Sequence, residues 1–143
     1  MKDVVIVSAC RTAIGGFGGS MRDLNGATLA SVVMKEAIDR AGIDPAIIDD
    51  VRFGCCVESS DTLNVCRVGA LMAGIPDTVP AVTINRVCIS GMEAVISGMA
   101  MIQAGMADVI LAGGVEHMSS VPAQSAGRTL GAAGFRIRCL WTP

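Results

Sequence analysis

Cys88 has the clearest potential for covalent chemistry in this sequence. It lies between a predicted strand at residues 81–84 and a predicted helix at residues 90–103, so its thiol is expected near the positive end of the helix dipole. Unpaired backbone N–H groups at a helix start stabilise the thiolate, which is the nucleophilic form of cysteine. The alternative is that Cys88 is only a small buried hydrophobic residue, and the same alternative applies to every cysteine of the chain. The cysteines are Cys10, Cys55, Cys56, Cys66, Cys88 and Cys139.

The elements that would position Cys88 alternate along the chain. Apolar runs predict strands at 4–7, 51–57, 81–84 and 108–112, the first of them buried. Helical periodicity predicts helices at 28–41, 64–73 and 90–103. Thr28 is the expected N-cap of the first helix, and Gly42 is its expected C-cap glycine. This order predicts an α/β fold with a mainly parallel sheet and helices on both faces.

Composition excludes several classes of function. The 143 residues are 52% hydrophobic and 17% charged, with a formal net charge of −2, so nucleic acid is not an expected partner. No apolar run reaches the ~18 residues of a membrane helix, and the N-terminus lacks an export signal. With irregularly spaced cysteines and a single histidine, His117, we expect reduced thiols in the cytoplasm and no bound metal.

A second candidate site is the glycine-rich loop that follows the first predicted strand. Gly15, Gly16, Gly18 and Gly19 surround Phe17, a composition that could cradle a phosphate. Their spacing matches neither a Walker loop nor a Gly-x-Gly-x-x-Gly turn that opens a helix. We therefore interpret the segment as a turn.

Four segments together resemble the thiolase family. Residues 82–94 resemble the Asn-x-x-Cys-x-Ser-Gly segment of the thiolase nucleophile, and residues 105–119 resemble its strand and Gly-Gly-x-Glu-x-Met-Ser loop. Residues 5–19 resemble the family's opening strand and loop, and residues 64–76 resemble its Gly-Gln-Asn-x-x-Arg helix, although Leu63 replaces the glutamine. The resemblance covers residues 1–122 and implies the N-terminal half of the thiolase fold.

Acyl transfer between coenzyme A thioesters is the activity that this resemblance implies. Cys88 would accept an acyl group, and the acyl-enzyme would serve either condensation of two acetyl-CoA to acetoacetyl-CoA or the reverse thiolysis. Acetyl-CoA, acetoacetyl-CoA or another 3-ketoacyl-CoA would be substrates, with no further cofactor. The intact family forms homo-oligomers. Its activating histidine and second cysteine lie further downstream and are absent here; His117 and Cys139 are not expected to replace them.

The last residues depart from the thiolase pattern. Residues 1–122 carry a net charge of −5, whereas residues 123–143 contain three arginines and no acidic residue. We predict an incomplete thiolase N-terminal domain over 1–122 and an aberrant tail over 123–143. One permitted set of codons for residues 131–138, read in another frame, encodes a thiolase-like string, so out-of-frame translation is our hypothesis for the tail.

Two alternatives to a working thiolase remain open from the sequence. The chain could be a catalytically inactive thiolase remnant or interaction module, since the downstream acid–base groups are missing. A ketoacyl synthase relative would share the architecture and a cysteine at a helix start, but the two loop motifs at residues 85–91 and 113–119 favour a thiolase.

Overall fold

The computed structural model describes residues 3–59, 62–120, 124–125 and 128–129. Its helices are α1 (Gly26–Ala41), α2 (Val65–Met72) and α3 (Ser90–Gln103), with two short 3-10 helices at Pro45–Ile47 and Met118–Ser120. The strands are β1 (Asp50–Gly54), β2 (Ala81–Ile84), β3 (Ile110–Gly114), β4 (Gln124–Ser125) and β5 (Arg128–Thr129). Within this described part of the chain, no helix is long and apolar enough to cross a membrane.

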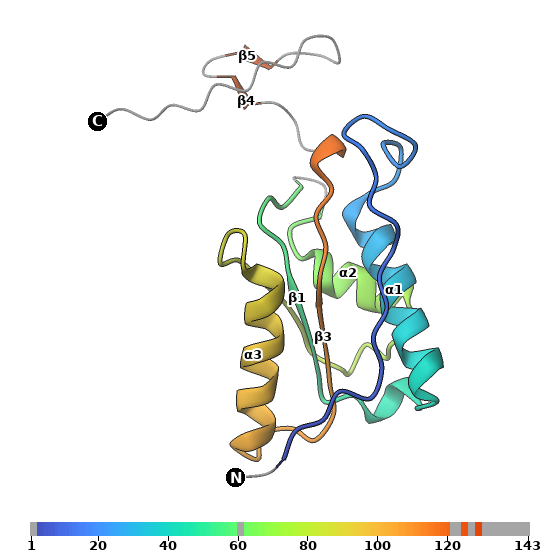
Figure 1. Ribbon diagram of the computed structural model, residues 1–143, viewed down its shortest axis with the longest axis vertical. Coiled ribbons are helices and arrows are strands. Elements are labelled where there is room, and N and C mark those ends of the chain that lie inside the picture. Colours follow the sequence, from blue (N-terminus) through green and yellow to red (C-terminus); the bar gives the residue numbers. More distant parts are fainter. Residues whose placement is uncertain (1–2, 60–61, 121–123, 126–127, 130–143) are drawn as a thin grey trace, which may run out of the picture.

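β1 is the central strand of a parallel three-stranded sheet in the order β2-β1-β3. Val51 is in register with Ala81 of β2 and with Leu111 of β3. α3 covers one face of the sheet, and α1 and α2 cover the other (Figure 1). β4 and β5 form a separate antiparallel pair. The expected parallel α/β sheet with helices on both faces is confirmed.

Alternation along β1 explains this layering. Val51 and Phe53 point into the core formed with α1 and α2, where they are 0% and 2% exposed. Arg52 points to the opposite face, where its guanidinium donates to Ser97 Oγ of α3 at 3.1 Å and to the buried Asp50 carboxylate at 2.7 Å. A strand covered on both faces needs side chains that are either apolar or paired. In β1 the two charged side chains, Arg52 and Asp50, pair with each other.

The helix ends follow local capping chemistry. α1 begins two residues before the predicted Thr28, because the Asn25 side chain is the N-cap and accepts from the Thr28 N–H at 2.8 Å. Its C-cap is Gly42, in the left-handed region at φ 65° as predicted. Asn64 caps α2 by accepting from Arg67 N–H at 2.9 Å. The predicted bounds of β2 and α3 are confirmed, and β3 begins two residues later than predicted.

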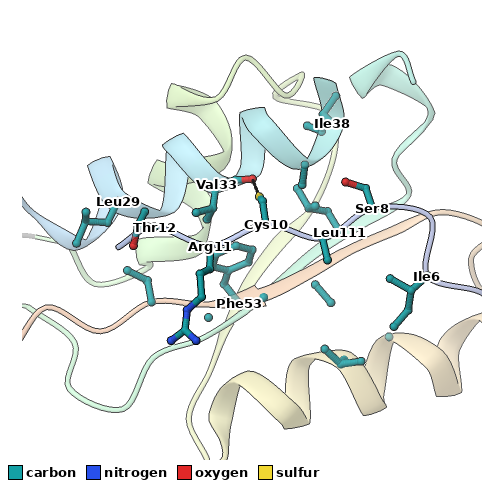
Figure 2. Close-up of a pocket in the computed structure, with 18 of the residues that line it drawn as sticks. Ile6, Ser8, Cys10, Arg11, Thr12, Leu29, Val33, Ile38, Phe53 and Leu111 are labelled. Carbon is teal, nitrogen blue, oxygen red and sulfur yellow. Dashed lines mark hydrogen bonds between the residues drawn. The ribbon is translucent and has the colours of Figure 1, made fainter. Parts of the chain in front are cut away.

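The prediction of a buried strand at residues 4–7 is wrong. The segment belongs to no strand, and Val5, Ile6 and Val7 are 74–80% exposed. β-branched residues suit a strand, but a strand also needs a neighbour for its backbone hydrogen bonds. The residues that follow this segment are held against α1, where Cys10 Sγ donates to the Val33 carbonyl at 3.2 Å (Figure 2) and Arg40 donates to the Ala9 carbonyl at 3.2 Å.

Gly54 allows the N-terminus of α3 to lie directly on the sheet. A Cβ on this residue would come within 2.2 Å of the Ser90 carbonyl carbon and 2.3 Å of the Gly91 nitrogen. Both are backbone atoms, so the clash could be relieved only by moving the helix and the Cys88 loop before it. This contact explains why β1 ends in a glycine.

We expect Gly54→Ala to destabilise the chain by about 1–3 kcal/mol, the usual cost of overpacking. The midpoint and slope of urea unfolding would measure the change. Gly16→Ala is the matched control, because a Cβ on Gly16 meets nothing within 4 Å. Equal stability of the two variants would show that α3 is not in this close contact.

Candidate active site

Cys88 lies in the loop between the end of β2 at Ile84 and the start of α3 at Ser90, and it is exposed. No side chain caps the N-terminus of α3, so the positive end of this 14-residue helix stays open toward the loop. Glu93 is the acidic residue of the first turn, and its carboxylate pairs with Arg86 at 2.6 Å. The structure therefore places Cys88 where the sequence predicts it.

The residue before the cysteine has a strained backbone. Val87 has a φ of 51°, and it is the non-glycine residue with positive φ in the described part of the chain. This conformation is rare for a β-branched side chain and costs about 1–3 kcal/mol. Asn85 Oδ1 accepts from the Val87 N–H at 3.0 Å, and Ser90 Oγ donates to the Val87 carbonyl at 2.5 Å. These two hydrogen bonds fix the bend that presents Cys88.

Glu116 connects the loop after β3 to the loop after β1. Its exposed carboxylate accepts from the Cys56 N–H at 2.8 Å and from the Val57 N–H at 2.9 Å. On the other side of the same turn, the Asn85 side-chain amide donates to the Cys56 carbonyl at 2.8 Å. The ends of all three parallel strands thus meet in one hydrogen-bonded chain that runs from Glu116 to Asn85 and ends beside Cys88.

Three of the other described cysteines, Cys55, Cys56 and Cys66, lie in environments that disfavour a thiolate. Burial raises the pKa of Cys55 to about 11, with a further contribution from Glu116, and burial raises the pKa of Cys66 to about 12. Loss of solvation also raises the pKa of Cys56, and Glu116 adds to the shift. All five cysteines in the described residues are free thiols.

His117 links the loop after β3 to the glycine-rich loop. It is 9% exposed, and its Nε2 lies 2.9 Å from the Met21 carbonyl; since a carbonyl can only accept, Nε2 carries the proton. Ser119 Oγ accepts from the Gly18 N–H at 3.0 Å, which fixes the same two loops together. Across the residues that the structure describes, no group of three metal-ligating side chains is placed to hold an ion.

Comparison with known proteins identifies the family. The family model described as "Thiolase, N-terminal domain" matches residues 4–134. The chain belongs to the thiolase family. It is 49% identical over 121 residues to an acetyl-CoA acetyltransferase of Syntrophomonas wolfei and 43% identical over 123 residues to a beta-ketoadipyl-CoA thiolase of Pseudomonas knackmussii. Each match covers 85% of this chain and 31% of the relative.

A solved thiolase has the same fold. The crystal structure of the Bacillus anthracis acetyl-CoA acetyltransferase matches 92% of this chain with a TM-score of 0.82 and 42% sequence identity, and the match covers 34% of that chain. The expected thiolase resemblance and fold are confirmed. This chain therefore spans about a third of the length of the thiolases that it matches. The division at residue 122 stays a prediction, because most of the tail lies outside the described residues.

The hydrogen-bonding role of Glu116 was not foreseen from the sequence, although the residue lies in the thiolase-like loop at 113–119. We expect Glu116→Gln to destabilise the chain by about 1 kcal/mol, since an amide offers one acceptor oxygen to two N–H donors. Amide exchange at Cys56 and Val57 should also accelerate. Glu36→Gln is the control, because Glu36 forms a surface ion pair with Arg40 at 2.6 Å. Unchanged exchange at Cys56 and Val57 would contradict the assignment.

Proposed function

We propose that this thiolase chain carries the acyl-accepting half of a thiolase active site, with Cys88 as the nucleophile toward coenzyme A thioesters. The observation that carries the proposal is the exposed thiol at the open N-terminus of α3, directly after the strained Val87. Helix N-termini stabilise thiolates and the negative charge that develops during acyl transfer. The buried Cys55 and Cys66 thiols, with pKa values raised to about 11 and 12, are poor competitors.

The proposed step is a thioester exchange. The Cys88 thiolate attacks the carbonyl carbon of acetyl-CoA, the new sulfur–carbon bond forms, and the coenzyme A sulfur leaves as a thiolate that takes a proton. The enolate carbon of a second acetyl-CoA would then attack the acetyl carbonyl of the acetyl-enzyme; the bond to the Cys88 sulfur breaks, the Cys88 thiolate is released, and acetoacetyl-CoA forms. Thiolysis of a 3-ketoacyl-CoA would run through the same steps in reverse. Coenzyme A enters as part of the substrate. The relatives' names support this substrate class and span two acyl groups.

Mass spectrometry of the chain after incubation with acetyl-CoA tests the proposal. One acetyl group should appear, and peptide mapping should place it on Cys88. Free coenzyme A should appear in equal amount. Acetylation confined to lysines, or spread over several cysteines, would contradict the assignment of Cys88.

The proposal also covers the cellular compartment and the assembly of the protein. The free thiols of the described residues suit a reducing compartment, which supports the cytoplasm. Assembly into homo-oligomers would follow the family.

A further inference from the structure

The side chains that flank Cys88 along the chain are mostly apolar. Val87 and Ile89 are its direct neighbours in the loop, and Met92 lies in the first turn of α3. They are 61%, 50% and 64% exposed. Side chains of a helix lean toward its N-terminus, so Met92 covers the side of the turn nearest the loop. An acyl group carried by Cys88 would therefore lie among apolar side chains.

The arginine of this loop is already paired. Arg86 lies two residues before Cys88, and its guanidinium donates to the Glu93 carboxylate at 2.6 Å. Its backbone is fixed as well, because the Arg86 N–H donates to Ser90 Oγ at 2.8 Å. The Arg86 side chain is 63% exposed and that of Glu93 is 22% exposed. Glu93 therefore holds the guanidinium over the first turn of α3 and neutralises it.

Glu116 adds a further negative charge at the same edge of the sheet. Its carboxylate accepts from two N–H groups of the 55–57 turn, and Asn85 holds that turn to the Cys88 loop. Taken together, the charges of Arg86, Glu93 and Glu116 are negative on balance. A carboxylate at the far end of an acyl group would find a neutralised arginine here, and apolar surroundings would cost it solvation.

We propose that Glu93 is a positioning residue that sets the charge specificity of Cys88: by neutralising Arg86, it makes the thiol accept uncharged acyl groups in preference to acyl groups that end in a carboxylate. The names of the relatives span both kinds, since one acts on acetyl-CoA and another on beta-ketoadipyl-CoA. The inference deepens the proposed function and rests on it. Glu93 acts through Arg86 and needs no contact with the reacting atoms.

Iodoacetate and iodoacetamide test the charge selection without any thioester. Both reagents alkylate the Cys88 sulfur, and they differ by one negative charge, so peptide mapping gives a ratio of rates. Glu93→Gln should raise the iodoacetate-to-iodoacetamide ratio about 3-fold, in keeping with a charge interaction at an exposed site. Salt at ~1 M should remove the gain. Arg86→Gln should lower the ratio about 3-fold, and Glu93→Asp should retain the parent ratio because it keeps the charge.

Hexanoyl-CoA and adipyl-CoA extend the test to the acyl group. Their acyl chains are equal in carbon number, and only the adipyl chain ends in a carboxylate. We expect Cys88 of the parent chain to accept hexanoyl at least ~3-fold faster, and Glu93→Gln to reduce that preference about 3-fold. Adding Arg86→Gln to the Glu93→Gln chain should abolish the reduction. Glu36→Gln is the matched control, because Glu36 pairs with Arg40 on α1 at 2.6 Å.

The outcomes separate this inference from the acyl transfer on which it rests. If neither thioester acylates Cys88 while the alkylation ratio shifts as expected, charge control by Glu93 stands and acyl transfer fails. If both thioesters acylate Cys88 at a ratio that Glu93→Gln leaves unchanged, the inference is wrong and acyl transfer stands. An equal shift with Glu36→Gln would also overturn it, because the effect would then come from the net charge of the chain. Circular dichroism would show that each variant folds.

Discussion

Replacing Cys88 by serine is expected to abolish acetylation of the chain by acetyl-CoA and to remove its fastest reaction with iodoacetamide. Cys88 is the exposed cysteine of the described residues, and serine is close to it in size. At pH 8, pKa values of about 11 and 12 leave Cys55 and Cys66 only ~10⁻³ and ~10⁻⁴ ionised, at least ~10²-fold less than an ordinary exposed thiol. Limiting iodoacetamide and peptide mapping would measure the order of labelling.

Cys56→Ser is the control for this experiment. Cys56 lies in the turn that Asn85 connects to the Cys88 loop, and the pKa of its thiol is raised by loss of solvation and by Glu116. Its removal should leave labelling and acetylation of Cys88 in place. Both serine variants should unfold at the urea concentration of the parent chain. Faster labelling of Cys55, Cys56 or Cys66 than of Cys88 would count against the proposed nucleophile.

The parts of the fold that the sequence predicts well depend on local patterns. β2 and α3 have the predicted bounds, because an apolar run and a helical repeat are each readable within about a dozen residues. The run at 4–7 has the same local signal and yet forms no strand. Whether such a run forms a strand depends on a neighbouring strand that is remote in sequence, which no local pattern reports.

Local sequence likewise predicts one part of the candidate site and misses another. Cys88 is predictable, because its position between a strand and a helix is a local property. The connection from Glu116 through the 55–57 turn to Asn85 joins residues 60 and 29 positions apart along the chain. It exists because parallel strands end at the same edge of a sheet, and the register that aligns Gly54 with Ile84 and Gly114 is set by packing of the whole sheet.

The second prediction of large effect is that the chain alone acylates once and does not turn over. A thiolase cycle also needs a group to remove the α-proton of acetyl-CoA and a group to protonate the departing coenzyme A, and each contributes typically ~10²- to 10⁴-fold. The resemblance places both groups downstream. The chain's one histidine, His117, is buried. Its Nε2–H is bound to the Met21 carbonyl, and its Nδ1, the nitrogen left to accept a proton, is itself buried, so the residue is poorly placed to act as either group.

Release of acetyl-CoA from acetoacetyl-CoA and coenzyme A would be followed over many equivalents of chain. We expect at most one equivalent, formed slowly, with the whole Syntrophomonas wolfei relative as the positive control and Cys88→Ser as the blank. Steady release above that blank would contradict the prediction. His117→Gln would then decide its origin: a loss of turnover without loss of the single acylation would make His117 the base, whereas retained turnover would require a proton acceptor elsewhere in the chain.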